Sequence, residues 1–475
     1  MNRWVFLFFS SLTFFTAEFF VDQSAPLVSR LSGTAEACNN GTDNTCLDFT
    51  ATQFNSLFVA HFWAGGLAAL CTGFIIGKFG VWFTSCGTAG LLLVGLLLFT
   101  IGPYSASTTI AFWVMLFGRL IFALGYFAQI VLSHQVKAHW FFGRELGVAY
   151  GIYHDSSRLS MIFAYASLGS IVRRVGLQNT LWITFAICML APICAITAGW
   201  IYKKYASNTI DTAVFTGGFA GRPHEFGLRK CIELAPDYWI IAGMIFCYFG
   251  GIFTTLADFP KYLTEVYGYS ETKAGQLTGI IPDIAIITPL FGYLIDRFGR
   301  RDIFNFTGTL LFFFGLIGIA FIPGFMPPLA CLFIAISFAI MTVSFWSSIP
   351  VITPPSHVGV AMGIGIGLQA LAAGLLLLIT GFLLDQMTIS VVQRWMNFFI
   401  LLATLAGLSW LLSGASIYLD RKNPKRPLRR RHQLPAVPED MAFEDAGELS
   451  PLMKEIQKPD DRYAQYSPML TAVIT

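Results

Sequence analysis

The stretch Gly292-Tyr-Leu-Ile-Asp296-Arg297-Phe-Gly299-Arg300-Arg301 interrupts a strongly apolar background, and it decides the fold. A weaker copy, Gly73-Phe-Ile-Ile-Gly77-Lys78-Phe79-Gly80, lies in the first half of the chain. Glycines let two helices approach closely, arginines suit a membrane surface, and an aspartate can accept from a neighbouring helix end. We therefore expect both hairpins to form a gate, with an ordinary basic loop as the alternative. Its residues would be Gly292, Asp296, Arg297, Gly299, Arg300, Arg301, Gly73 and Lys78.

The composition indicates an integral membrane protein. Hydrophobic residues make up 55% of the chain and charged residues only 12%, whereas a soluble domain has about 25% charged residues. The nine cysteines show no metal-ligand spacing, and no phosphate-binding loop or nucleophile motif is present. We expect a lipid bilayer around the protein and no enzyme activity, cofactor, metal or nucleic-acid partner.

Hydrophobic segments long enough to cross a bilayer occur twelve times. Each needs roughly 20 apolar residues, and the first, which begins at Trp4, is too long and too aromatic for a cleaved signal. The predicted spans are 4–28, 53–77, 82–102, 110–134, 146–171, 180–202, 237–257, 273–295, 302–323, 327–349, 358–385 and 396–418. These predict an all-α membrane protein with an N-terminal six-helix bundle (1–202), a cytoplasmic linker (203–236), a C-terminal six-helix bundle (237–418) and a disordered cytoplasmic tail (419–475).

The distribution of Lys and Arg predicts that both termini are cytoplasmic. In that orientation most of the 30 basic residues, Lys137 among them, fall on the cytoplasmic side, as the positive-inside rule requires. The opposite side then holds only Arg30, Arg173, Arg174, Lys261, Lys273 and Arg394.

The loop 29–52 is extracytoplasmic in this topology. It contains the glycosylation acceptor pattern Asn40-Gly41-Thr42, flanked by Cys38 and Cys46. We expect glycosylation at Asn40 and a disulfide between the two cysteines, with two free thiols as the alternative.

The fifth span carries the best candidate binding cluster, which is His154, Asp155 and Arg158. Arg158 lies about 18 Å along the helix from Leu146, close to the middle of the membrane. The three-residue and four-residue spacings allow all three side chains to share one face. We interpret Arg158 as the receptor for a substrate carboxylate, oriented by Asp155. A structural ion pair to a neighbouring helix is the alternative.

Acidic residues in other spans are further candidates, because an ionisable side chain in a bilayer is costly unless it is used. Glu18 and Asp22 are four apart in the first span and could bind an amino group or carry a proton; Asp22 could also be solvated at the interface. Asp283 follows Pro282 and is expected to be a third buried acid. Trp346 and Gln369 could line the cavity, although packing explains each as well.

The full hairpin pattern resembles the loop signature of the major facilitator superfamily. Arg119, which begins Arg-Leu-Ile-Phe-Ala-Leu-Gly, resembles the second signature of that superfamily. The resemblance implies two pseudo-symmetric six-helix bundles, and it gives Arg119 the task of bonding loop backbone near the cytoplasmic end.

Other stretches resemble, more narrowly, the lysosomal dipeptide transporters of this superfamily. They are Gly118-Arg119, the run Trp140–Leu146 with Gly151 and Arg158, and Trp346 with Pro354, Gly359, Ala361 and Gly363. The resemblance implies export of dipeptides from the lysosome to the cytosol by a uniporter, beside a glycosylated lysosomal accessory membrane protein. It also places Arg158 and Asp22 where the family keeps an arginine and an aspartate.

The chain departs from that family where an acidic residue should follow the glycine of the fourth span. Tyr126 and Phe127 follow Gly125 instead, so recognition of an amine would shift to Asp155, Glu18 or Asp22. Two tail patterns resemble lysosomal sorting signals, an acidic dileucine type and a tyrosine-based type. Their residues are Glu448, Leu452 and Met453 in the first and Tyr466 and Met469 in the second.

The sequence thus predicts a secondary transporter of small organic solutes, with dipeptides as the first expectation and the lysosomal membrane as its location. Alternatives are a proton-coupled transporter of amino acids or organic anions, a plasma-membrane location, and a receptor or scaffold that does not transport.

Overall fold

The computed structural model describes residues 2–32, 46–143, 145–206, 234–322, 325–354, 357–384, 390–423 and 427–429. The first bundle contains α1 (Asn2–Asp22), the short α2 (Val28–Leu31), α4 (Ala51–Ile101), α5 (Thr108–Phe141), α6 (Leu146–Cys188) and α7 (Leu190–Ala206). The second contains α10 (Pro236–Tyr267), α11 (Glu271–Ile284), α12 (Thr288–Phe298), α13 (Arg301–Phe321), α14 (Pro327–Ile352), α15 (Val358–Leu384) and α16 (Val391–Lys422). Short 3₁₀ turns, Gly102–Tyr104 and Ala285–Ile287, follow α4 and α11.

Ten helices of the described chain are long and apolar enough to cross a membrane, and two of them are long enough to cross twice. Those two extend over Gln53–Tyr104 and Leu146–Tyr205. Each contains one glycine with a positive φ, Gly80 at 79° and Gly176 at 78°, where the backbone leaves the helical path. The long helices therefore fold back as two arms each, and the described chain makes twelve crossings.

Local sequence signals set several helix ends. Thr50 and Gln53 form a capping box at the start of α4, and Ser107 caps α5 through the Ile110 N–H. At the other end of a helix, Gly268 adopts φ 65° and terminates α10. The predicted seventh span, 237–257, was therefore too short, because the helix continues through polar residues until a glycine ends it.

The tail begins later than the composition predicted. α16 continues to Lys422, and Leu428 beyond it is buried. The Leu428 N–H donates to Asp420 at 3.0 Å, and its carbonyl accepts from the Arg301 N–H at 3.0 Å. The prediction of a disordered tail from 419 was thus wrong for these residues, since backbone bonds to α13 and α16 hold the segment.

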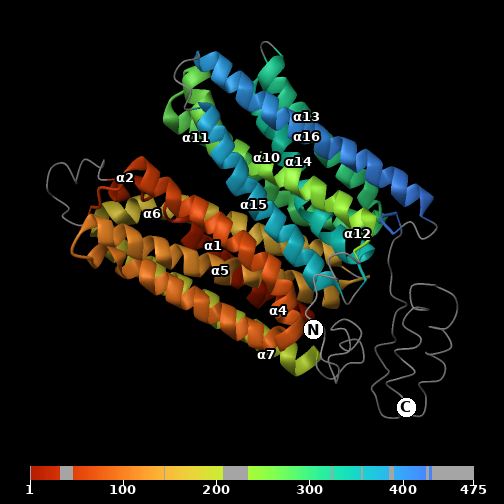
Figure 1. The fold of residues 1–475 in the computed structure, drawn as a ribbon, viewed down its shortest axis with the longest axis horizontal. Coiled ribbons are helices and arrows are strands. Elements are labelled where there is room, and N and C mark those ends of the chain that lie inside the picture. Colours follow the sequence, from red (N-terminus) through yellow and green to blue (C-terminus); the bar gives the residue numbers. More distant parts are fainter. Residues whose placement is uncertain are drawn as a thin grey trace. The chain divides into compact units, whose positions relative to one another are not determined.

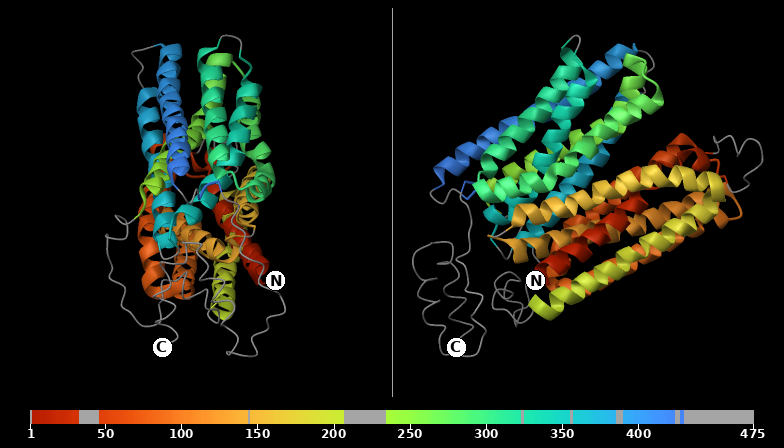
Figure 2. Two further views of the ribbon diagram at one scale, coloured as in Figure 1. Left: turned by 90° about the vertical axis from the view of Figure 1, so that its right-hand side faces the viewer. Right: turned by 180° about the vertical axis from the view of Figure 1, so that it is seen from behind.

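The helices of each half pack mainly on one another, and two helix pairs make the most extensive contacts between the halves (Figures 1 and 2). One pair is α4 with α15, and the other is α6 with α12. A Cβ on Gly73 would lie 2.5 Å from the Gly359 carbonyl oxygen, and one on Gly292 would lie 2.4 Å from that of Gly147. Only glycine permits these backbones to approach so closely, as in other membrane helix pairs.

We call the end of the helices that carries Gly80 and Gly299 the hairpin end, and the opposite end the far end. Both glycine contacts belong to the hairpins, so the two bundles are tightly joined at the hairpin end.

Candidate functional site

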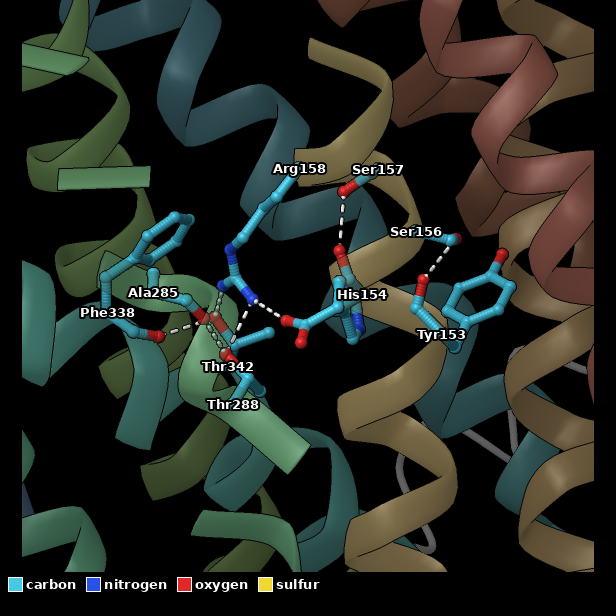
Figure 3. Close-up of polar contacts among 10 residues, drawn as sticks. Tyr153, His154, Ser156, Ser157, Arg158, Ala285, Thr288, Phe338 and Thr342 are labelled. Carbon is cyan, nitrogen blue, oxygen red and sulfur yellow. Dashed lines mark hydrogen bonds and ion pairs between the residues drawn. The ribbon is translucent and has the colours of Figure 1, made fainter. Parts of the chain in front are cut away.

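Arg158 on α6 lies between the two bundles and is almost fully buried. Its Nη1 donates to Asp155 Oδ1 at 2.8 Å and to Thr288 Oγ1 at 2.6 Å, and its Nη2 donates to Thr342 Oγ1 at 3.0 Å. Figure 3 shows the guanidinium reaching toward both threonines, which belong to the second bundle. The ring of Phe338 on α14 lies 4.7 Å from the guanidinium carbon. One cation therefore contacts two helices across the interface, α12 and α14.

The partners of Arg158 differ in strength. Asp155 is the expected acidic neighbour on the same helix face, so the ion pair is internal to α6. The partners on other helices are neutral hydroxyls, whereas a carboxylate would add a negative charge and two acceptor oxygens that match the guanidinium. A ligand carboxylate could therefore replace Thr288 and Thr342 at the guanidinium, whereas an ion pair that fixes two helices would need an acid on the second helix.

His154 contacts a second histidine that the sequence analysis did not single out. The Nε2 atoms of His154 and His134 are 3.2 Å apart, and His134 Nδ1 lies 2.9 Å from the Ile130 carbonyl oxygen. Because that oxygen can only accept, His134 Nδ1 donates to it, and the neutral His134 ring presents Nε2 as an acceptor. His154 Nε2–H is then the donor to His134.

Trp346 on α14 packs against this histidine pair. Its ring centroid lies 5.0 Å from that of His134 and 6.4 Å from that of His154. The indole is 1% exposed, and its Nε1 has no hydrogen-bond partner among the described residues. Gln369, the other expected cavity residue, is half-buried on α15.

Lys137 on α5 is fully buried, although the sequence analysis counted it with the cytoplasmic loop cations. The predicted fourth span ended at residue 134, whereas α5 continues to Phe141. Lys137 Nζ lies 2.8 Å from the ring centroid of Tyr153 and 5.4 Å from that of Tyr150. It has no hydrogen-bond partner in the part of the chain that the structure describes.

The acids of α1 form a separate group with Tyr126 and Arg119 of α5. Glu18 accepts a hydrogen bond from the Tyr126 hydroxyl, and Asp22 Oδ2 is buried with no partner among the described residues. Tyr126 is one of the two residues that replace the expected acid of the fourth span. Burial of Asp22, 9% exposed, does not fit the alternative that it is solvated.

Two expectations for single residues were wrong. Arg119 donates to the carbonyls of Phe20 and Val21 at 2.7 and 2.5 Å, so it bonds the last turn of α1 rather than a loop near the hairpins. α5 begins at Thr108 at the far end, which places Arg119 on that side of the helix centre. Asp283 is exposed, because α11 ends one residue later and turns its carboxylate away from the protein interior.

The carboxylate of Asp296 bonds the start of α6. Its two oxygens accept from the backbone N–H groups of Gly147 and Val148 at 2.9 and 3.0 Å. The first N–H groups of a helix lack partners within it and favour a negative charge. Arg301 Nη2 lies 3.7 Å from Asp296 Oδ1 on the other side of the carboxylate. This hairpin therefore joins the second bundle to the first by bonds to the backbone.

The described contacts of the remaining hairpin cations lie within their own bundle. Arg300 pairs with Asp302 at 3.2 Å. Arg297 is exposed and donates to the Tyr293 hydroxyl at 3.3 Å. Lys78 of the weaker hairpin is also exposed and lies 5.3 Å from the Phe79 ring centroid.

Several predicted sites lie outside the described residues. For one of them, Cys38, the predicted disulfide partner Cys46 is described. Cys46 is disulfide-bonded, while Cys38 and Asn40 are not among the described residues, so the Cys38–Cys46 pairing and the glycosylation stay predictions. The sorting patterns at Glu448, Leu452, Met453, Tyr466 and Met469 are likewise outside them. Within the described ranges, no group of three or more His, Cys, Asp or Glu could hold a metal ion.

Two six-helix bundles that meet through glycine contacts at one end, with charged side chains buried between them, define a secondary transporter. The chain belongs to the Major Facilitator Superfamily, whose sequence model matches residues 2–375 and 284–459. It is a multi-pass membrane transporter of small solutes and not an enzyme. The fold expected from the hairpin signature is thereby confirmed.

Curated relatives are similar over most of the chain. The Homo sapiens protein named "Lysosomal dipeptide transporter MFSD1" is 23% identical over 353 residues, which cover 72% of this chain and 73% of that protein. The Danio rerio protein of the same name is 22% identical over 357 residues, covering 71% of this chain and 75% of that protein.

Solved structures of the superfamily share the fold at low identity. The proton:xylose symporter XylE, bound to 6-bromo-6-deoxy-D-glucose, has a TM-score of 0.64 at 16% identity and covers 88% of this chain and 96% of its own. A bacterial homologue of the iron transporter ferroportin in an outward-facing state has 0.65 at 11%, with coverage of 88% and 100%. The human organic anion transporter MFSD10 has 0.61 at 15%, with coverage of 87% and 99%.

Proposed function

We propose that the chain exports dipeptides from the lysosome to the cytosol as a uniporter, with Arg158 binding the substrate's terminal carboxylate. The observation that carries the proposal is the position of Arg158, buried between the bundles with two neutral hydroxyls as its partners on other helices. A dipeptide carboxylate offers two oxygens to a planar guanidinium, which is the strongest pairing available to it. The names of the curated relatives support the choice of dipeptides.

Alternating access would occur by rocking of the two bundles around this site. The bonds from Asp296 to the start of α6 hold the hairpin end closed in this conformation. When a substrate carboxylate binds Arg158, it replaces the hydroxyls of Thr288 and Thr342 at the guanidinium. The bundles can then move relative to each other. Glu18 and Asp22 are the candidates for the substrate's amino group, because both are acids in the first bundle's interior.

The same proposal includes topology and location. The asymmetry of Lys and Arg places the hairpin end and both termini in the cytosol. The far end, with the Cys46 disulfide and the Asn40 acceptor, then faces the lysosomal lumen, where a glycosylated accessory membrane protein would dock. The two tail patterns would direct the protein to lysosomes.

A second candidate is a proton-coupled transporter of amino acids or other organic anions. The buried His134–His154 pair favours it, since two adjacent imidazoles can hold and release a proton. Flux that acidifies the receiving compartment in step with solute would select this candidate, whereas a uniporter moves no proton with the dipeptide. A scaffold that does not transport is a third possibility, against which the buried charges argue.

The test is uptake of labelled dipeptides and of the matching free amino acids into proteoliposomes. Wild type should take up dipeptides saturably, and Arg158→Ala should reduce that uptake at least about 30-fold, because two charge-assisted hydrogen bonds are lost. The matched control is Arg173→Ala, an exposed arginine on the same helix whose side chain bonds the Gly169 carbonyl in the described chain. It should transport as wild type does.

Uptake of free amino acids alone would refute the dipeptide proposal and retain a transporter. Dipeptide uptake that is equal in wild type and Arg158→Ala would refute the role of Arg158. Absence of both fluxes from folded protein would favour the scaffold.

A further inference from the structure

Lys137 is a cation inside the first bundle that the proposed function leaves unused. It is fully buried, and its Nζ has no hydrogen-bond partner among the described residues. Its near contacts are the ring faces of Tyr153 and Tyr150. Ring faces attract a cation, but this attraction is weaker than the cost of burying an ion. A buried, unpartnered ammonium group of this kind is suited to receive an anion.

The polar groups around Lys137 also include more hydrogen-bond donors than acceptors. On α6, His154 directly follows Tyr153, on whose ring Lys137 lies, and precedes Arg158 by four residues, so His154 lies between the two cations along the helix. The Trp346 Nε1–H, whose ring packs on His134, is a buried donor without a partner in the described chain. Among the described residues, the acid bonded to this group is Asp155, which is already paired with Arg158. Lys137 and Trp346 thus present two unsatisfied donors from opposite bundles.

We propose that Lys137, with the His134–His154 pair and Trp346, forms a second anion subsite, and that the preferred substrates carry two carboxylates. The inference deepens the proposed function and rests on it: the substrate class becomes dipeptides with an acidic side chain. Arg158 would hold one carboxylate and Lys137 the other. Because Lys137 is buried here, the second carboxylate meets it as the bundles close around the substrate.

The spacing of the two cations suits such a substrate. Lys137 lies over Tyr153, five residues before Arg158 on α6, which is about 7.5 Å along the helix axis toward the hairpin end. The terminal and side-chain carboxylates of a C-terminal Glu are separated by three carbon atoms, and each carboxylate–cation hydrogen bond adds about 2.8 Å, so the two carboxylates of Ala-Glu can reach both cations. A neutral dipeptide has only one carboxylate and would leave Lys137 without a counter-charge.

The experiment compares Ala-Glu with Ala-Gln, which have nearly the same shape and differ by one negative charge. Uptake into proteoliposomes is measured for wild type, for Lys137→Met, and for Lys204→Met as a control, because Lys204 is exposed near the end of α7. Wild type should prefer Ala-Glu by about tenfold or more in kcat/KM, as expected for one charge-assisted bond. Lys137→Met should lose the preference and keep Ala-Gln uptake, and Lys204→Met should retain the preference.

Equal uptake of the two dipeptides by wild type, or an unchanged preference in Lys137→Met, would overturn the subsite and leave the proposed function standing. Should neither dipeptide be transported, the proposed function fails and the subsite is judged by binding. Thermal stabilisation of the purified protein by Ala-Glu but not Ala-Gln, lost in Lys137→Met, would support it; equal stabilisation by both, or by neither, would overturn it. Lys137→Arg replaces the Met variant if the latter does not fold, and it should retain the preference.

Discussion

The hairpin Gly292–Arg301 and its counterpart Gly73–Gly80 occupy equivalent positions in the two bundles. Each begins with a glycine that packs against a backbone carbonyl of the other bundle, at 2.4 and 2.5 Å from an added Cβ. Each ends with a glycine in the left-handed region, Gly299 at φ 67° and Gly80 at φ 79°. The close glycine approach, the positive φ and the seven-residue spacing between the two glycines are therefore shared, while ψ differs, at 9° for Gly299 and 169° for Gly80.

The chemistry of the two hairpins differs at the position four residues after the first glycine. There the strong hairpin has Asp296, bonded to two N–H groups of α6, and the weak hairpin has Gly77. The start of α15 is approached instead by Gln135, a neutral amide whose Oε1 lacks a partner in the described chain. Close packing thus joins the bundles at both hairpins, and charge strengthens only one.

Among the hairpin substitutions, Asp296→Ala should have the largest effect on closure of the hairpin end. It removes the charge that distinguishes the strong hairpin and leaves the glycine packing that both hairpins share. The change abolishes two hydrogen bonds to backbone N–H groups and leaves Arg301, which is 5% exposed, without its carboxylate. Closure of the hairpin end should weaken by about 2–4 kcal/mol. A cysteine placed at the hairpin end should become more reactive toward a membrane-impermeant thiol reagent.

Asp296→Asn is the graded control for that experiment. An amide oxygen still accepts one of the two N–H groups but has no charge, so accessibility should lie between wild type and Asp296→Ala. If hairpin-end accessibility is the same in all three proteins, the assignment of this hairpin as the gate is wrong.

Gly292→Ala and Gly73→Ala test the shared packing, and they should have similar effects. In both cases the added methyl group meets backbone rather than a movable side chain, so the helices must separate, at about 1–3 kcal/mol. Accessibility at the hairpin end should rise in each variant. Gly87→Ala is the matched control on α4, since nothing lies within 4 Å of its added Cβ. A large difference between Gly292→Ala and Gly73→Ala would show that the two interfaces are not equivalent.

Much of the fold could be predicted from the sequence, because membrane crossings depend on local hydrophobicity. The twelve segments and the hairpin signature are properties of short stretches, and length and composition suffice to find them. The predicted helix ends were less accurate. At α10 and α16 the helix continues through polar residues beyond the end of the apolar run. Burial of Leu428 depends on hydrogen bonds to Asp420 and Arg301, which lie on α16 and α13, and no local sequence pattern predicts such contacts.

The candidate site was predictable where its geometry lies within one helix. Asp155 and Arg158 are three residues apart on α6, and they form the expected contact. Lys137 and His134 were missed, since their neighbours Tyr153, His154 and Trp346 come from other helices. Both follow the last long apolar run of α5, so they resemble interface residues in sequence. One signal was available, namely two ionisable residues about one turn apart, His134 at the end of a predicted span and Lys137 just beyond it.

Gly77→Asp should strengthen the weak hairpin by giving it the acid that the strong one has. Gly77 is half-buried and follows Gly73 by one helical turn, so its side chain points along the same face toward the start of α15. A carboxylate near the unpaired N–H groups of a helix start is worth about 0.3–1 kcal/mol. Hairpin-end accessibility should fall and transport should slow, because opening becomes harder. Increased accessibility would mean that Gly77 is needed for packing, as Gly73 is.

Arg297→Ala and Lys78→Ala should have the smallest effects, and these should be equal in the two hairpins. Both side chains are exposed, and their described contacts are a tyrosine hydroxyl and a phenylalanine ring within their own hairpins. Surface substitutions of this kind change stability by about 0.5 kcal/mol or less. If closure depends on the contacts across the bundles, neither variant should change hairpin-end accessibility measurably. A clear loss of closure in Arg297→Ala alone would mean that charge strengthens the strong hairpin through the membrane surface as well as through Asp296.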